Sequence, residues 1–328
     1  MMTQSIRIAC GLFLAAAMSS AFAQSRDPAQ SYPARPLRIL VGFSAGSTTD
    51  ILARVVGQKL NEAWGQPVIV DNRPSAGGVV ASQYVTAATP DGYTLISVSA
   101  GHAVSAALYS KLPYDTEKDF SGISLLATVP SILVVAPNAG IKSVKDLVAR
   151  ARSKPGGYNY SSPGIGSANH LGSELLKSMA GIDVTHVPFK GIPEAITAAG
   201  TGTVLFNLSP IVNVLPLAKS GRVLALATTT SKRSAAMPDL PTIAEAGVTG
   251  YAFDPWFGLL ATGKTPRTVV AKLNREVVRI LALPDVKERL LGLGAEATPT
   301  TPEQFDAHVH TEIAKFKKIV RDANIRVE

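Results

Sequence analysis

Cysteine is nearly absent: Cys10 is the single cysteine among 328 residues. One cysteine excludes a disulfide framework and a zinc site built from several thiolates. Charged residues are also scarce, at 17%, whereas 46% of the residues are hydrophobic, so the composition excludes an intrinsically disordered chain. The 27 glycines and 22 prolines follow no repeat, which excludes a collagen-like protein. A globular chain of about two domains remains.

Long hydrophobic runs are missing as well, apart from a short one near the N-terminus. Residues 8–18 are apolar, Arg7 precedes them, and Ala21-Phe22-Ala23 follows. A basic residue, a short apolar core and a small-x-small site are typical of a secretory signal peptide, whereas a membrane-spanning helix needs about 20 apolar residues. We therefore predict cleavage after Ala23 and a periplasmic mature chain without cysteine, lipid or membrane span.

Positive charge is in modest excess, with 32 Lys and Arg against 24 Asp and Glu and a formal net charge of +8. Nucleic-acid-binding proteins cluster their basic residues, often with aromatic side chains between them. Here the basic residues are scattered, and the densest group, 315–318, lies in a late amphipathic segment. We expect no nucleic-acid partner, and the charge is compatible with a small anionic ligand.

Short apolar runs alternate with helical patterns along the chain. The first stretch predicts strands and helices in alternation at 37–43, 49–64, 67–72, 79–88 and 94–99. A second stretch repeats the order at 132–137, 144–153, 158–161, 168–180 and 184–188. A strand at 256–261 then precedes helices at 266–283, 284–291 and 302–323.

This order predicts an α/β protein of two lobes, each a mostly parallel sheet flanked by helices. The final helices lack enough strands for a sheet of their own, so we expect them to pack on the first lobe. The predicted division is a signal peptide at 1–23, a discontinuous first lobe at 24–128 plus 252–328, and an inserted second lobe at 129–251. The cleft between the lobes is the default ligand site.

The sharpest local motif is Gly42-Phe43-Ser44-Ala45-Gly46, between the first strand and the first helix. It matches the G-x-S-x-G turn that exposes the nucleophilic serine of α/β hydrolases. In those enzymes the turn follows several strands, one of which leads to part of the oxyanion hole. Here it ends the first strand of the mature chain, and no histidine stands in a recognisable triad context. A secreted serine hydrolase using Ser44 is the alternative function.

Anion binding is the second interpretation of the same turn. Where the helix begins, the loop carries four hydroxyl side chains, at Ser44, Ser47, Thr48 and Thr49. The unpaired N–H groups of a helix N-terminus attract carboxylates and phosphates. The loop at 161–170 repeats this design, with serines and glycines between a strand and a helix. Helix capping explains one such loop; two of them, one in each lobe, favour a ligand held from both sides.

Other titratable groups give weaker signals. His308 and His310 are two positions apart, which puts them on different faces of a helix and disfavours a metal site. Asp254 lies near the second lobe boundary and is a candidate to face the cleft. We expect no metal, no cofactor and no catalytic residue.

Eight segments, in unbroken order, carry a family resemblance. They are 35–50 (RPLRILVGFSAGSTTD), 66–78 (QPVIVDNRPSAGG), 90–95 (PDGYTL), 108–120 (LYSKLPYDTEKDF), 158–171 (YNYSSPGIGSANHL), 186–195 (HVPFKGIPEA), 238–247 (PDLPTIAEAG) and 256–260 (WFGLL). Together they resemble the substrate-binding receptors of tripartite tricarboxylate transporters, the Bug-type periplasmic proteins. The resemblance covers nearly all of the mature chain, from about Pro33 to Ile325.

The resemblance implies a two-lobed, type II-like periplasmic binding protein that closes on a small carboxylate. The ligands of such receptors include di- and tricarboxylates, amino acids and aromatic acids. The receptor delivers them to the membrane subunits of the transporter, and we expect a monomer without catalysis. In this family the loop after the first strand and the serine- and glycine-rich loop of the second lobe cradle the carboxylate.

Carried over by position, with neighbouring candidates added, the predicted ligand-binding residues are Phe43, Ser44, Ala45, Gly46, Ser47, Thr48, Asp50, Ser99, His102, Ser161, Ser162, Gly164, Gly166, Ser167, His170, Ser209 and Asp254. The first loop departs from the family's common P-F-x-x-G-G-x-x-D pattern. Gly42 replaces the proline and Ser47 replaces the second glycine. Ser47 adds a side chain at the proposed site, which leaves the size and orientation of the ligand open.

Overall fold

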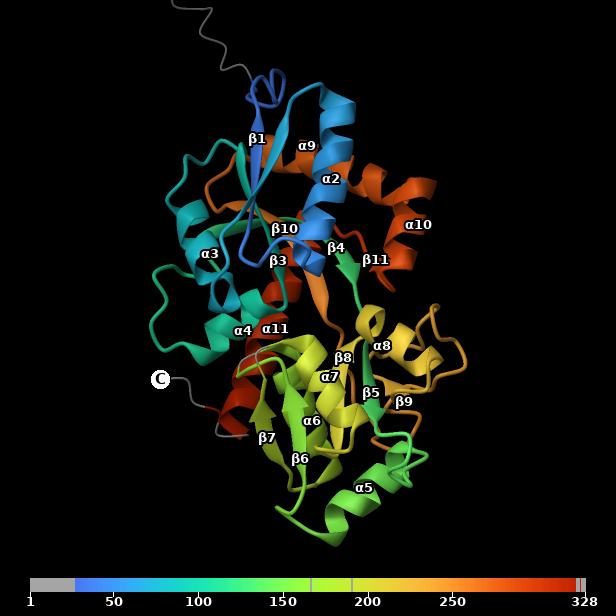
Figure 1. Cartoon of the computed structure of the whole chain (residues 1–328). Helices are drawn as coiled ribbons and strands as arrows, with labels where there is room; N and C mark the ends of the chain where they lie inside the picture. The colour runs from blue at the N-terminus through green and yellow to red at the C-terminus, as the bar shows by residue number, and fades with distance from the viewer. Residues whose placement is uncertain (1–26, 166, 190, 323–324, 326–328) are drawn as a thin grey trace, which may run out of the picture.

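The computed structural model describes residues 27–165, 167–189, 191–322 and 325. The predicted signal peptide at 1–23 and the candidate ligand residue Gly166 lie outside the described residues. Among the helices within these ranges, none combines the length and the apolar character that a bilayer span requires. The strands form two separate sheets, which lie one above the other in Figure 1.

The first sheet has six strands in the order β11-β4-β10-β3-β1-β2. They are β1 (Leu37–Val41), β2 (Val68–Asn72), β3 (Thr94–Ser99), β4 (Phe120–Thr128), β10 (Trp256–Thr262) and β11 (Glu296–Ala297). The helices of this half are α2 (Thr48–Trp64), α3 (Val79–Thr86), α4 (Gly101–Leu108), α9 (Arg267–Ala282) and α10 (Pro284–Gly292), with the short 3-10 turn η2 (Ala76–Gly78) before α3. Gly65 ends α2 at a φ of +65°, the left-handed conformation that commonly terminates helices.

The second sheet has five strands in the order β7-β6-β8-β5-β9. They are β5 (Ser131–Val135), β6 (Asn159–Ser162), β7 (Thr185–Pro188), β8 (Phe206–Pro210) and β9 (Leu224–Thr228). The helices of this half are α5 (Val144–Ser153), α6 (Ala168–Ala180), α7 (Ile192–Gly200) and α8 (Ile211–Lys219).

The chain passes between the sheets twice, and the two crossing segments lie side by side. Val129 N donates a hydrogen bond to Pro255 O at 2.9 Å, and Phe253 N donates to Thr229 O at 2.9 Å. The last helix, α11 (Pro302–Asp322), contacts α4 of the first half and α6 of the second. Both crossings and α11 therefore connect the two halves.

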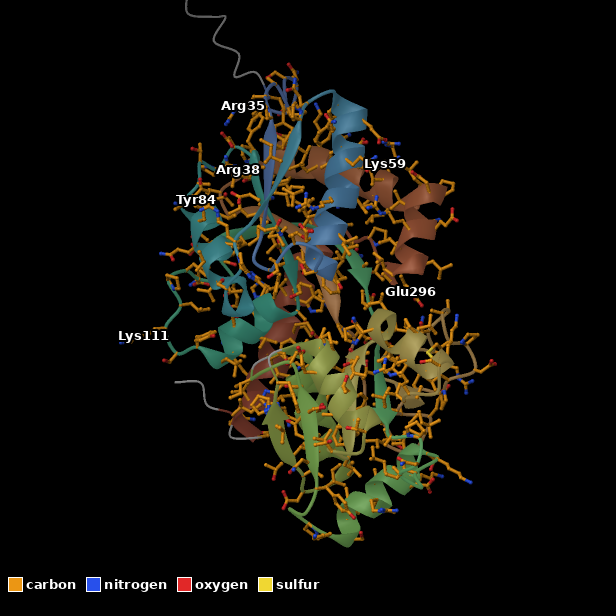
Figure 2. The ribbon with its side chains drawn as sticks, in the orientation of Figure 1. Arg35, Arg38, Lys59, Tyr84, Lys111 and Glu296 are labelled. Atoms are coloured by element: carbon orange, nitrogen blue, oxygen red, sulfur yellow. The ribbon has the colours of Figure 1, made fainter. Side chains whose placement is uncertain are left out.

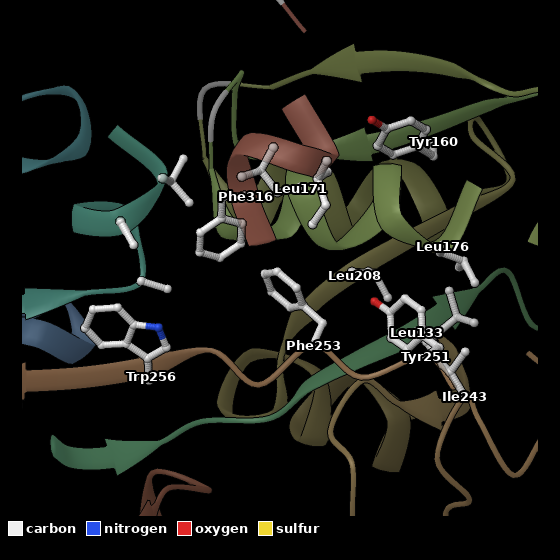
Figure 3. Packing of buried hydrophobic residues seen from close by; sticks show 14 of the residues in the cluster. Leu133, Tyr160, Leu171, Leu176, Leu208, Ile243, Tyr251, Phe253, Trp256 and Phe316 are labelled. Atoms are coloured by element: carbon white, nitrogen blue, oxygen red, sulfur yellow. The ribbon is translucent and has the colours of Figure 1, made fainter. Parts of the chain in front are cut away.

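Buried side chains form a core that extends from one half to the other across the junction, the region of the two crossings. Figure 3 shows Leu171 of the second half beside Phe316 of α11, and in this view Phe253 lies between Trp256 of β10 and Leu208 of β8. Phe253 and Trp256 are 2% and 1% exposed. The aromatic residues at the second crossing are therefore packed in the core.

The α/β class with two helix-flanked sheets is confirmed, but the sheets are mixed rather than mostly parallel. In the first sheet β1 pairs in parallel with β2 and β3, whereas β10 is antiparallel to β3 and β4. In the second, β6 pairs in parallel with β7 and β8, whereas β5 is antiparallel to β8 and β9. Each antiparallel strand, β10 and β5, directly follows a crossing and enters its sheet from the junction.

Candidate functional site

A cavity of about 660 Å³ opens between the two sheets and is called the cleft below. Ser47 and Ser99 line it from the first half, Ser167 and Pro210 line it from the second, and Val129 lies at a crossing. Ser47 follows β1, Ser99 ends β3, Ser167 follows β6 and Pro210 ends β8. The carboxyl ends of these strands therefore meet at one cavity, which is where open α/β sheets bind their ligands.

Ser47 fixes the start of α2 at the cleft. Its backbone is extended, with φ −66° and ψ 157°, and its hydroxyl accepts a hydrogen bond from Asp50 N at 3.3 Å. Gly46, which also lines the cleft, has a φ of +82°, a left-handed conformation that favours glycine. The first N–H groups of α2 have no partner within the helix, so they are available at the cleft.

Asp50 stabilises the conformation of this loop through hydrogen bonds of its side chain. The buried carboxylate accepts hydrogen bonds from Gly46 N at 2.9 Å, Arg54 Nε at 3.0 Å and Asn72 Nδ2 at 2.9 Å. Asn72 Nδ2 also donates to Phe43 O at 3.1 Å. Burial alone raises the pKa of Asp50, but the hydrogen bonds from Arg54, Gly46 and Asn72 outweigh it and keep the pKa below its usual value.

Ser167 starts α6 on the opposite side of the cleft in the same way. It has φ −68° and ψ 153°, and its hydroxyl accepts from His170 N at 3.2 Å. The same hydroxyl donates to Gly164 O at 2.8 Å, which closes the loop on itself. Pro163 and Ile165 from this loop also line the cleft, and Ile165 is 58% exposed.

Three further helices begin at the cleft, and none was predicted: α4, α8 and α7, whose first residue Ile192 lines the cleft. α4 starts at Gly101, whose N–H donates to Ser99 Oγ at 3.3 Å, and α8 follows β8 directly at Pro210. The N-cap residues Ala100 and Pro210 have no side-chain capping bond. Asn213, on the first turn of α8, is exposed and lines the cleft.

The described lining residues of the cleft include no Asp, Glu, Lys, Arg or His. Charged side chains such as Arg35, Arg38 and Lys59 project from the outer part of the first half in Figure 2. Any positive potential in the described part of the cleft therefore comes from helix N-termini and backbone N–H groups. Over the same residues, no group of three or more His, Cys, Asp or Glu is arranged to hold a metal ion.

Comparison with known proteins identifies the family. The family model described as "Tripartite tricarboxylate transporter family receptor" matches residues 52–325. The chain belongs to this receptor family. BugT of Bordetella pertussis is 33% identical over 302 residues, which cover 92% of this chain and 93% of BugT.

Two similar solved structures contain a bound carboxylate. Rpa4515 of R. palustris with adipate has a TM-score of 0.80 and 36% identity, and the match covers 90% of this chain and 99% of that one. MatC of Rhodopseudomonas palustris with bound malate has a TM-score of 0.75 and 34% identity, covering 88% of this chain and 100% of that one. Two solved relatives of this chain thus hold a carboxylate, adipate in one and malate in the other.

The predicted ligand residues of the receptor fall into two groups. Those that line the cleft are Phe43, Gly46, Ser47, Thr48, Ser99 and Ser167. Ser44 and Ala45 are exposed on the first loop, and Gly164 is half-buried in the second, without lining the cleft. The remaining described candidates, Asp50, His102, Ser161, Ser162, His170, Ser209 and Asp254, do not line it either.

Three of these serine hydroxyls make their contacts within the second half. Ser161 Oγ donates to Ala195 O at 2.8 Å, and Ser209 Oγ donates to Asn207 Oδ1. Ser162 Oγ lies 2.7 Å from Nε2 of His186, whose ring stacks on His170 with the centroids 4.0 Å apart. Burial lowers the pKa of each of these two histidines to about 4, so both are neutral at pH 7.

His102 belongs to the packed interior and Asp254 is half-buried, and neither lines the cleft. His102 is 2% exposed, its ring lies 4.8 Å from Phe120, and neither ring nitrogen has a hydrogen-bond partner. Burial lowers its pKa to about 4. Asp254 accepts a hydrogen bond from Ser231 N at 3.2 Å beside the second crossing, and burial raises its pKa.

Several lining residues were not predicted, among them Ser75, Gly77, Ser105, Asn169 and Asn213. The sequence contained a signal for the first two, because Pro74-Ser75-Ala76-Gly77-Gly78 follows β2 and has the same serine–glycine character as the other loops. A Cβ atom on Gly77 would overlap Ser105 Oγ, so glycine at this position allows the loop to pack against α4. Asn169 lies in the predicted loop at 161–170 but was not singled out there, and Asn213 has no comparable local signal.

Proposed function

We propose that this chain is a periplasmic receptor that captures a small carboxylate and delivers it to the membrane subunits of a tripartite tricarboxylate transporter. One observation carries the proposal: α2, α4, α6, α7 and α8, from both halves, begin at a single cleft whose described lining residues include no Asp, Glu, Lys, Arg or His. Such ends stabilise a carboxylate through backbone N–H groups and the helix dipole. The adipate and malate bound by the two relatives support the same ligand class.

The ligand-binding residues we propose are Phe43, Gly46, Ser47, Thr48, Ser99 and Ser167, which line the cleft. Asp50 acts on them indirectly, because it holds Gly46 and, through Asn72, the carbonyl of Phe43. The proposed lobes are 24–128 plus 252–328 and 129–251, with cleavage after Ala23 and a monomeric mature chain. The paired crossings at Val129 and Pro255 form the proposed hinge about which the lobes close.

We propose no catalytic step and no cofactor. A serine hydrolase would need a base beside Ser44, and His102 and His186 are poor candidates for it. His102 is buried with both ring nitrogens unpartnered, and His186 is bonded to Ser162 of the second sheet. A neutral cleft suits reversible capture of an anion.

A thermal-shift screen of carboxylic acids on the mature protein tests the proposal. A ligand at 100 times its Kd stabilises the folded state by about 2.7 kcal/mol, which raises the Tm by about 4 °C for a chain of this size. The matched control for each hit is its uncharged amide, for example succinamide for succinate, and we expect no shift with the amide. A set of di-, tri-, aromatic and amino acids that leaves the Tm unchanged contradicts the proposed function.

A further inference from the structure

One wall of the cleft is apolar and is formed by the carboxyl-terminal part of α4. Val104 and Leu108 of α4 line the cleft, followed by Tyr109, and Leu108 is the last residue of that helix. The carboxyl end of a helix carries partial negative charge, so this wall disfavours a carboxylate. The hydroxyl of Ser105, on the same helix, lies against Gly77.

An exposed apolar side chain enters the cleft from the second half. Ile165 is 58% exposed and lies in the loop between β6 and α6, with Pro163 beside it in the lining and Ile192 at the start of α7. An isoleucine left exposed in a cleft gains free energy when an apolar group covers it. The hydroxyl of Ser167 in this loop is already bonded to Gly164 O at 2.8 Å.

The size and charge of the cleft are consistent with a ligand that has both a carboxylate and an apolar part. Its volume of about 660 Å³ is in the range that holds ligands larger than a four-carbon acid. Without a lysine or arginine among the described lining residues, it has little to offset several negative charges close together.

We propose, as a refinement that rests on the proposed function, that the ligand is a carboxylate with an apolar body of at least four carbons. The carboxylate lies at the N-termini of α2 and α6, and the apolar body lies between the α4 wall (Val104, Leu108 and Tyr109) and Ile165. The receptor therefore selects aliphatic or aromatic acids over short hydroxylated acids.

Calorimetric titration of the mature protein with adipate and malate tests the proposal. Both acids carry two carboxylates, so the comparison isolates the body between them. We expect adipate to bind at least tenfold more tightly than malate. Hexanoate should exceed butyrate by about 16-fold, because each buried methylene contributes a factor of about four. Malate binding as tightly as adipate, or equal affinities for hexanoate and butyrate, overturns the proposal.

An Ile165→Ser variant locates the apolar body. We expect adipate to bind about fivefold more weakly and malate to be unaffected, since only adipate has the methylenes that cover the side chain. Leu291→Ser is the matched control, because Leu291 is 54% exposed and lies on α10 outside the cleft.

Leu108→Asn is a second variant on the opposite wall, with the same expectation: weaker binding of adipate and unchanged binding of malate. An equal loss for adipate and malate overturns the placement, whereas failure of every carboxylate to bind the folded wild type refutes the proposed function itself.

Discussion

Ser47 and Ser167 begin two helices from different sheets with nearly identical geometry. Their backbone angles are φ −66°, ψ 157° and φ −68°, ψ 153°, and each hydroxyl accepts from the N–H three residues later, at 3.3 Å and 3.2 Å. Both residues line the same cleft. The two halves thus present equivalent helix ends, with unpaired N–H groups, to one ligand.

A Ser47→Asp variant tests whether the α2 end binds an anion. Aspartate is as good an N-cap as serine, so we expect the Tm of the ligand-free protein to change little. A second negative charge beside the carboxylate should weaken binding at least tenfold, measured by calorimetry with the best acid from the screen. Ser143→Asp is the matched control: Ser143 caps α5, accepting from Asp146 N at 3.1 Å, and does not line the cleft. Unchanged affinity in Ser47→Asp would place the anion site elsewhere.

An Asp50→Asn variant tests whether carboxylate binding depends on the hydrogen bonds that Asp50 makes to the first loop. The carboxylate accepts from Gly46, Arg54 and Asn72, and an amide cannot accept all of these bonds. We expect a loss of about 1.5–3 kcal/mol in the free energy of unfolding in urea, together with weaker carboxylate binding. The control is Asp285→Asn, which removes an ion pair between Asp285 and Lys59 at 2.8 Å. Because the side chain of Asp285 is 60% exposed, this variant should lose little stability. Equal losses in the two variants would contradict the positioning role of Asp50.

Local signals allowed much of the fold to be predicted. The strand at 94–99 and the helices at 144–153 and 168–180 match β3, α5 and α6 residue for residue. Both helices start at a capping serine, Ser143 or Ser167. α4 and α8 escaped prediction because Ala100 and Pro210 give no side-chain cap. The direction of β10 and β5 has no local signal either, because it depends on how the chain crosses the junction.

The cleft could be predicted only in part, for a related reason. A serine in a strand–helix loop is a candidate ligand residue, and Ser47 and Ser167 do line the cleft. Ser161 and Ser209 lie in strands, so the sheet and its covering helices decide where their hydroxyls point. Ser161 Oγ donates to Ala195 O at 2.8 Å, and Ser209 Oγ donates to Asn207, contacts between residues up to 34 positions apart. Such pairings require the three-dimensional arrangement.

Acid should destabilise the receptor through its buried histidines. His102 has a pKa lowered by burial from 6.5 to about 4, so the unfolded chain takes up a proton first as the pH falls. Stability is therefore lost between pH 6.5 and pH 4, by roughly 2 kcal/mol at pH 5 for this one group. The variant His102→Phe suits the aromatic surroundings of Tyr114 and Phe120 and should show a smaller fall in Tm between pH 7.5 and pH 5.

The control for this experiment is His310→Gln. The side chain of His310 is 52% exposed and contacts Glu117 at 2.9 Å on the surface, so its replacement removes a histidine without changing the packed core. Identical pH profiles for wild type and His102→Phe would show that other groups govern the acid response.

Ser44 distinguishes the receptor from the alternative secreted hydrolase. Its side chain is exposed on the first loop but does not line the cleft, and one neutral hydrogen bond contributes only about 0.5–1.5 kcal/mol. We therefore expect Ser44→Ala to bind carboxylates within about tenfold of wild type. The wild type should not react with a fluorophosphonate, because that reagent labels only a serine activated by a base. Esterase activity that disappears in Ser44→Ala would show that binding alone is not the full function of this protein.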